Sequence, residues 1–196
     1  YMSYVFTVSR QLAEMGASLF QLGILGLVTS GTYAIVGPLA GHLSDRWGRK
    51  WIVVLGSLLN VVALTVCSQS HSPRVIYAVS ALAGGSVGMI FPPVIAWLTQ
   101  GGSSSSSAGS SVLFKFCIAW NLGMIAGQAG GGLLFPIDHS LPLLAAVLPM
   151  LAAAFLAARI EEYPEPDRPP DPVAAAPVLP AANGLRFAYL GWTANM

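Results

Sequence analysis

Charged residues are scarce in this sequence of 196 residues: nine are basic and eight are acidic, which is 9% of the chain. Soluble domains carry about 25% charged residues. Here 55% of the residues are hydrophobic and the mean hydropathy is +0.67. A chain of this composition cannot cover a folded surface with polar groups, which excludes a soluble domain. We therefore predict an all-α, multi-pass integral membrane protein whose first partner is the lipid bilayer.

Cysteine and histidine are also rare. The two cysteines, Cys67 and Cys117, lie in apolar runs without a recognisable spacing, which argues against a disulfide framework. The three histidines, His42, His71 and His139, fall between apolar runs and share no helix face with another ligand type. We expect no metal site and no cofactor.

Two further function classes lack their signals. The net charge is only +1, and no basic face with interleaved aromatic residues suggests a nucleic-acid partner. Serine is abundant, but neither a Ser-His-Asp arrangement nor a G-x-S-x-G turn is present, and we expect no enzyme activity.

Long apolar runs are what the sequence has instead, and a helix needs about 20 such residues to span a bilayer. Residues 1–8 are too few and are interpreted as the stump of a truncated span one, followed by a polar loop at 9–16. Residues 17–158 are predicted to hold spans two to six. Their expected ranges are 17–40, 51–68, 75–99, 112–135 and 141–158.

Three stretches do not fit a complete span. The Gly/Ser-rich stretch 101–111 is uncharged and predicted to be a flexible connection. Residues 159–185 combine acidic residues with many prolines, which favours an extended, semi-rigid linker. Residues 186–196 are interpreted as the start of span seven, so we expect a fragment of a longer protein.

The most informative stretch is the 41–50 motif, Gly41-His-Leu-Ser-Asp45-Arg46-Trp-Gly48-Arg49-Lys50. It lies between two apolar runs and is predicted to be a water-exposed turn. Any such hairpin can be rich in Arg and Lys, but that does not explain Asp45 or the two glycines. Gly41 permits close helix packing, and Gly48 permits a turn that a Cβ would resist. Asp45 requires compensation by neighbouring arginines or by the positive end of a helix.

The pattern G-x-L-S-D-R-x-G-R-K resembles the signature between spans two and three of transporters of the major facilitator superfamily (MFS). The resemblance implies a six-span amino-terminal half built as a 3+3 inverted repeat, with a second six-span half as its partner. It further implies a conformational latch formed by the 41–50 motif. Asp45 would engage the opposite half, Arg46 and Arg49 would fix it, and Lys50 would complete the motif.

A second set of glycines lies in predicted span five. Gly123, Gly127, Gly131 and Gly132 resemble the fifth-span motif of proton-driven antiporters, which implies efflux. That motif carries Pro where this chain has Gln128, which weakens the implication to a preference. No Asp, Glu or His lies in the middle of a complete span, so no proton carrier is visible.

Three amides, Asn60, Asn121 and Gln128, are expected at depth in the membrane. An amide in hydrocarbon is costly unless it is hydrogen-bonded. These side chains can line a substrate cavity or join helices by hydrogen bonds, and the sequence leaves both open. Small residues spaced by four, such as Gly37 with Gly41 and Gly84 with Gly88, predict close helix contacts.

The distribution of Lys and Arg predicts the orientation. One side receives only Arg10 and Arg74, and the other receives the remaining basic residues. We therefore expect the 41–50 motif and the linker 159–185 to be cytoplasmic, in a plasma (inner) membrane.

Together these features predict a secondary active transporter that moves a small-molecule substrate by alternating access, with a mild preference for efflux. The alternative is a membrane protein of the same architecture that transports nothing and acts as a sensor or partner. Saturable solute flux in vesicles separates the two.

Overall fold

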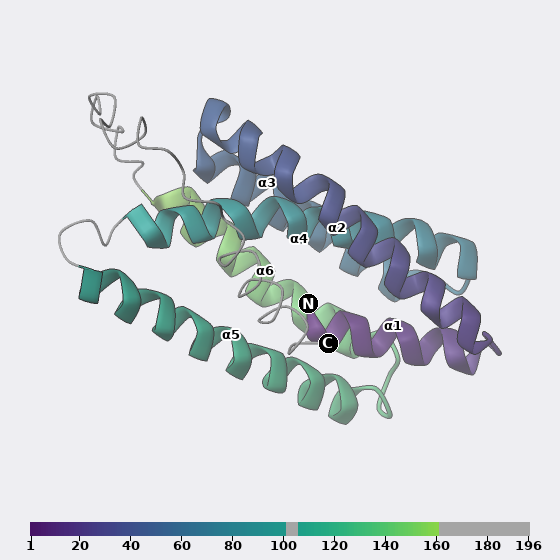
Figure 1. Ribbon diagram of the computed structural model, residues 1–196. Helices are drawn as coiled ribbons and strands as arrows, with labels where there is room; N and C mark the ends of the chain where they lie inside the picture. Colours follow the sequence, from purple (N-terminus) through teal and green to yellow (C-terminus); the bar gives the residue numbers. More distant parts are fainter. Residues whose placement is uncertain (101–105, 161–196) are drawn as a thin grey trace. The chain divides into compact units, whose positions relative to one another are not determined.

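Every element in the described part of the chain is an α-helix. The structure is a computed structural model, which describes residues 1–100 and 106–160 (Figure 1). The helices are α1 (Met2–Glu14), α2 (Leu19–Trp47), α3 (Arg49–Gln69), α4 (Pro73–Gln100), α5 (Ser106–Leu134) and α6 (Leu141–Arg159). The linker predicted at 159–185 lies outside the described residues except for its first two, as does the start of span seven predicted at 186–196.

Four of these helices, α2, α3, α4 and α6, are long and apolar enough to cross a membrane. Large apolar side chains such as Phe20, Leu27 and Ile35 remain on the outside of α2, each more than two-thirds exposed. An apolar exterior of this extent is unfavourable in water and favourable in lipid. The protein is therefore an all-α, multi-pass integral membrane protein.

The helices are longer than the apolar runs that predicted them. Residues 9–14 continue α1, so the polar loop predicted at 9–16 is wrong for most of its length. Residues 106–110 begin α5, which likewise corrects part of the flexible connection predicted at 101–111. Hydropathy measures the length of chain that lies in hydrocarbon, whereas a helix ends where its backbone hydrogen bonds end.

The link from α1 to α2 shows how a local sequence sets a helix start. Gly16 adopts a positive φ of 83°, and Ser18 then caps α2. The Ser18 hydroxyl accepts from the Gln21 backbone N–H at 3.3 Å, and the Ser18 N–H donates to Gln21 Oε1 at 2.8 Å. This reciprocal capping box satisfies two backbone donors that the helix cannot satisfy itself.

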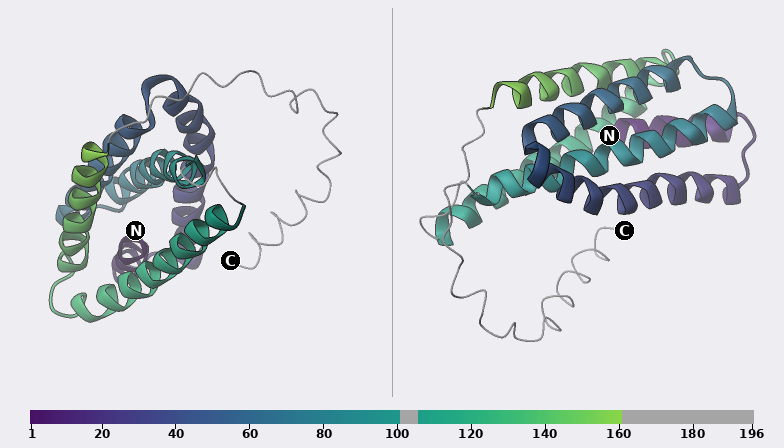
Figure 2. Two further views of the ribbon diagram at one scale, coloured as in Figure 1. Left: turned by 90° about the vertical axis from the view of Figure 1, so that its left-hand side faces the viewer. Right: turned by 90° about the horizontal axis from the view of Figure 1, so that it is seen from above.

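Helix α4 is the centre of the packing. It packs along α2 on one side and along α3 on another, α6 lies along α3, and α1 lies along α5 (Figures 1 and 2). The main buried cluster combines Val8 and Leu12 of α1 with Leu64 of α3 and Ile76 of α4. The short helix α1 is thus joined to the others through an apolar core near the α1–α2 link.

The last turn of α1 is also tied to the α5–α6 turn. The Arg10 guanidinium lies 4.6 Å from the centre of the Phe135 ring and 3.3 Å from Glu14 Oε1. The His139 ring lies 4.6 Å from that of Phe135, and its Nε2 is 3.4 Å from Glu14 Oε2. Phe135 is buried and contacts both Arg10 and His139, and these two residues in turn pair with Glu14. This group lies at the end of the bundle opposite the 41–50 motif.

Candidate gating motif and cavity

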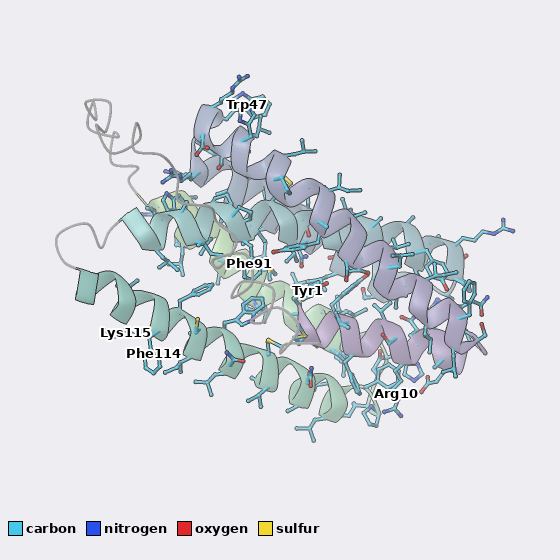
Figure 3. All side chains as sticks on the ribbon, in the orientation of Figure 1. Tyr1, Arg10, Trp47, Phe91, Phe114 and Lys115 are labelled. Atoms are coloured by element: carbon cyan, nitrogen blue, oxygen red, sulfur yellow. The ribbon has the colours of Figure 1, made fainter. Side chains whose placement is uncertain are left out.

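The 41–50 motif is almost entirely helical, which corrects the predicted turn. Helix α2 continues to Trp47 and α3 begins at Arg49, so Gly48 alone makes the connection. Gly48 has φ 89° and ψ 137°, a region that is essentially restricted to glycine. The sequence prediction that position 48 needs a glycine therefore has a backbone reason. Figure 3 shows Trp47 projecting from the end of α2, where its side chain is exposed.

Two charges meet across this connection. Arg49 Nη2 lies 3.6 Å from Asp45 Oδ1, a pair that joins the last turn of α2 to the first turn of α3. The Arg49 side chain is only 17% exposed, whereas that of Asp45 is 65% exposed. A cation is unfavourable at a helix N-terminus, and Asp45 offsets this. Asp45 thus keeps an accessible carboxylate oriented by a half-buried arginine.

The remaining basic residues of the motif have distinct surroundings. Arg46 is exposed in the last turn of α2, where a positive charge is favourable at the helix C-terminus. Lys50 Nζ lies 5.7 Å from the centre of the neighbouring Trp51 ring. The motif therefore presents one carboxylate among three basic side chains at the end of the α2–α3 hairpin.

Glycines hold the motif-bearing helix against α4. A Cβ on Gly41 would lie 3.8 Å from Pro92 Cβ, and one on Gly88 would lie 3.0 Å from the Tyr33 carbonyl oxygen and 3.1 Å from the Gly37 nitrogen. Of the glycines that the sequence singled out, Gly37 and Gly88 therefore meet across the α2–α4 contact, whereas Gly41 lies against Pro92 and Gly84 against Thr29. Backbones that approach this closely give helix pairs in membranes much of their van der Waals attraction.

The glycines of α5 serve two purposes. A Cβ on Gly127 would lie 3.2 Å from the Ser3 nitrogen, and one on Gly131 would lie 3.1 Å from Phe6 Cδ1, so both admit α1. A Cβ on Gly132 would lie 3.9 Å from Phe6 Cζ, which is an ordinary van der Waals distance. A Cβ on Gly123 would meet nothing within 4 Å, and Gly123 instead lines a cavity.

That cavity has a volume of about 440 Å³ and lies between α1, α5 and α6. Its lining is apolar and aromatic, with few polar atoms. Its wall on α5 includes Trp120 and Met124, that on α6 includes Pro149 and Met150, and Tyr1 contributes from the start of the chain.

The amides expected at depth lie elsewhere. Asn60 is buried between α3 and α4, where its Nδ2 donates to Ser86 Oγ at 2.7 Å. Asn121 is exposed and donates to the carbonyl of Cys117, on its own helix, at 2.7 Å. Gln128 is exposed, and its Nε2 is 4.0 Å from Met2 Sδ. None of the three lines the 440 Å³ cavity.

A contact between aromatic residues of α2, α4 and α5 was not identified from the sequence. The Phe91 ring of α4 meets the Trp120 ring of α5 edge to face, with centroids 4.4 Å apart, and Tyr33 of α2 approaches Phe91 at 6.4 Å. Figure 3 shows Phe91 and Tyr1 on the side that faces α5. The available signal was the presence of large aromatic residues, Tyr33, Phe91 and Trp120 among them, within the predicted spans 17–40, 75–99 and 112–135.

No cluster of three potential metal-ligating side chains occurs among residues 1–100 and 106–160. Both cysteines are free thiols, with Cys67 buried and Cys117 exposed. In the turn between α5 and α6, the Ser140 hydroxyl and then the Ser140 backbone N–H donate to Asp138 Oδ1 and hold the pKa of that carboxyl below its usual value.

Comparison with known proteins gives a consistent assignment. The family model described as Major Facilitator Superfamily matches residues 1–194. The quinolone resistance protein NorA of Staphylococcus aureus is 28% identical over 131 residues, which are 67% of this chain and 33% of NorA. Multidrug resistance protein 1 of Bacillus subtilis is 30% identical over 140 residues, 71% of this chain and 35% of that protein. The matched stretches thus span about a third of the length of these relatives. Since the family model covers almost all of this chain, the chain belongs to the Major Facilitator Superfamily.

Proposed function

We propose that this chain is the amino-terminal half of a secondary active transporter that exports small, largely apolar solutes by alternating access. In this proposal the second half is a separate six-span bundle of the same longer protein. The 41–50 motif lies on the cytoplasmic side of a plasma membrane and closes that side in one conformation. The observation that carries the proposal is Asp45, an exposed carboxylate held in place by Arg49 at the single-residue connection between α2 and α3.

The physical argument for a latch begins with the environment of Asp45. Its carboxylate is oriented by the half-buried Arg49 and remains accessible to a further partner. Hydrogen bonds to charged groups contribute about 1.5–3 kcal/mol. One such contact between two halves would change the ratio of two conformations by roughly one to two orders of magnitude. This is enough to control access to the cavity without locking the protein permanently.

The nature of the cavity supports the class of solute. The space of about 440 Å³ is lined mainly by apolar and aromatic side chains, and the Phe91–Trp120 pair lies beside it. Flat or apolar molecules gain from such surfaces by burial and ring stacking. The names of the two relatives, which refer to resistance to quinolones and to multiple drugs, support export as the direction.

Solute flux in reconstituted vesicles tests the proposal with the complete transporter that contains this chain. Asp45→Asn removes the charge and keeps the shape, and we expect it to reduce flux by about tenfold, the equivalent of 1.4 kcal/mol. Membrane insertion should not change, because Asp45 is exposed. Asp138→Asn, an exposed acidic residue at the other end of the bundle, is the matched control and should leave flux unaltered.

Two results would overturn the proposal in different ways. Equal flux for the wild type and Asp45→Asn would refute the latch but not transport. Absence of saturable flux in the wild type, tested with several apolar aromatic compounds, would instead favour a non-transporting sensor or partner protein.

A further inference from the structure

A polar stripe runs along one face of α1 and is buried within the bundle. Tyr4, Thr7 and Gln11 follow each other at spacings of three and four residues, which places them on the same side of the helix. Tyr4 is 2% exposed, Thr7 is 0% exposed and Gln11 is 8% exposed. Burial of three polar side chains in one row costs free energy unless each of their polar atoms finds a partner.

Both ends of the stripe have hydrogen-bond partners outside α1. The Tyr4 hydroxyl and Ser80 Oγ of α4 are 2.7 Å apart, and Ser80 also donates to the Ile76 carbonyl at 2.7 Å. Gln11 Nε2 donates to the carbonyl of Ser70, just after α3, at 2.9 Å. These two bonds fix the direction of the Tyr4 and Gln11 side chains.

The middle of the stripe is different. Among the described residues, Thr7 Oγ1 and Gln11 Oε1 are buried and have no hydrogen-bond partner. Because the Gln11 amide nitrogen is committed to Ser70, the amide oxygen is held facing away from that bond. The Thr7 hydroxyl, which can donate and accept, and the Gln11 amide oxygen, which can only accept, therefore lie on one helix face and both lack a hydrogen-bond partner.

The orientation of Thr7 is unusual for this protein. Most serine and threonine hydroxyls with a hydrogen bond in α2, α3 and α4 donate to a carbonyl three or four residues earlier on their own helix. Examples are Thr29 to Leu25 and Thr65 to Val61, both at 2.8 Å. Thr7 makes no such bond, so its hydroxyl is free to bond outside its own backbone.

We propose that an internal water molecule binds between Thr7 and Gln11 and bridges the two side chains. Thr7 and Gln11 are four residues apart on α1, so their Cβ atoms are about 5–6 Å apart and the two side chains are neighbours on one helix face. The water donates one hydrogen to Gln11 Oε1 and bonds to Thr7 Oγ1. Buried waters typically make about three hydrogen bonds to otherwise unpaired groups, and these two atoms supply two of them.

The surroundings favour a neutral ligand over a cation. The acidic residues of the described segments, Glu14, Asp45 and Asp138, are all exposed, and none belongs to the stripe. Without a carboxylate to offset its charge, a buried cation would retain most of its desolvation cost. The water completes a row of hydrogen-bonding groups from Ser80 to Ser70 that joins α1 to α3 and α4.

A high-resolution density map of the complete protein in lipid nanodiscs tests the proposal. We expect a water peak within hydrogen-bonding distance of Thr7 Oγ1 and Gln11 Oε1. A dry site, with the Thr7 hydroxyl turned to the Ser3 carbonyl, would overturn the proposal. This measurement needs no variant and does not depend on transport activity.

A double-mutant cycle on thermal unfolding provides the second test. Thr7→Val and Gln11→Leu each remove one side of the shared site, so either substitution alone should already release the water. The double variant should therefore unfold at a temperature well above the value expected from adding the two single effects. Thr29→Val is the matched control, because Thr29 is also buried but its hydroxyl is bonded to its own helix. Its effect should add to that of Gln11→Leu. Strict additivity in the Thr7–Gln11 cycle would contradict the shared water.

Discussion

Gly84 of α4 lies directly against the backbone carbonyl of Thr29 in α2, at a point where the two helices leave no room for a side chain. A Cβ at position 84 would also lie 2.5 Å from Thr32 Oγ1. This contact lets α2, the helix that ends in the 41–50 motif, pack closely against α4.

Gly84→Ala should therefore destabilise the protein by about 1–3 kcal/mol, the usual cost of overpacking. Thermal unfolding in detergent measures the effect. Gly26→Ala on α2 is the control, because a Cβ there meets nothing within 4 Å. This control should be neutral or stabilising by up to about 1 kcal/mol, since Ala is the better helix former. Equal behaviour of both variants would show that the α2–α4 contact is looser than described.

Gly48 provides a second prediction, based on backbone conformation. With φ 89° and ψ 137°, Gly48→Ala should cost about 1–3 kcal/mol. Gly48→Asn should not restore stability, because Asn tolerates the left-handed helical region, where ψ is about 47°, and not this one. Unfolding temperatures of the two variants decide the point. Recovery with Asn would mean that the connection relaxes into a left-handed helical turn.

The two asparagines in α3 and α5 should respond differently to the same change. Asn60→Leu removes a buried hydrogen bond to Ser86 and should destabilise the protein by about 0.6–2 kcal/mol, the range for polar contacts between helices in membranes. Asn121→Leu replaces an exposed side chain that bonds only to its own helix, and stability should be unchanged or increased. Chemical denaturation in mixed micelles measures both. A larger loss for Asn121→Leu would point to a partner for Asn121 beyond the described residues.

Trp120 is expected to contribute to solute binding. Trp120→Ala removes its ring from the cavity wall and from Phe91, which should weaken binding of aromatic solutes by about 0.5–1.5 kcal/mol beyond the loss of buried area. Phe114→Ala is the matched control, because Phe114 lies on the same helix with an exposed side chain (Figure 3). Fluorescence titration with an apolar aromatic compound gives both affinities. Equal affinities would exclude the cavity as the binding site.

The sequence predicted helix type and order well because apolar length is a strong signal in membrane proteins. Residues 51–68 were predicted where α3 covers Arg49–Gln69, and 141–158 where α6 covers Leu141–Arg159. The end of span two was predicted at residue 40, whereas α2 ends at Trp47. His42, Ser44, Asp45 and Arg46 lower the hydropathy of this stretch while the backbone continues its helical hydrogen bonds, so hydropathy alone could not find that end.

Site residues could be predicted from the sequence where backbone geometry requires a particular residue type. They could not be predicted where their role depends on the direction of the side chain. Gly48, Gly84 and Gly88 could be identified, since a Cβ would be strained by the backbone at position 48 and crowded by the backbone of α2 at positions 84 and 88. The positions of Asn121 and Gln128 could not, because a shift of about 100° around a helix separates an inward from an outward side chain. Predicting that Trp120 meets Phe91 needs the rotation of two helices relative to each other, which a single sequence does not contain.

The most direct test of the latch is the accessibility of the cavity from each side of the membrane. A single cysteine at Ala126, a cavity-lining position, would be placed in the complete transporter after replacement of Cys67 and Cys117. Its labelling by a membrane-impermeant thiol reagent would then be measured with and without Asp45→Asn. We predict that loss of the carboxylate accelerates labelling from the side of the 41–50 motif by about tenfold, the equivalent of 1.4 kcal/mol. Identical labelling rates from that side in both proteins would contradict a latch at Asp45.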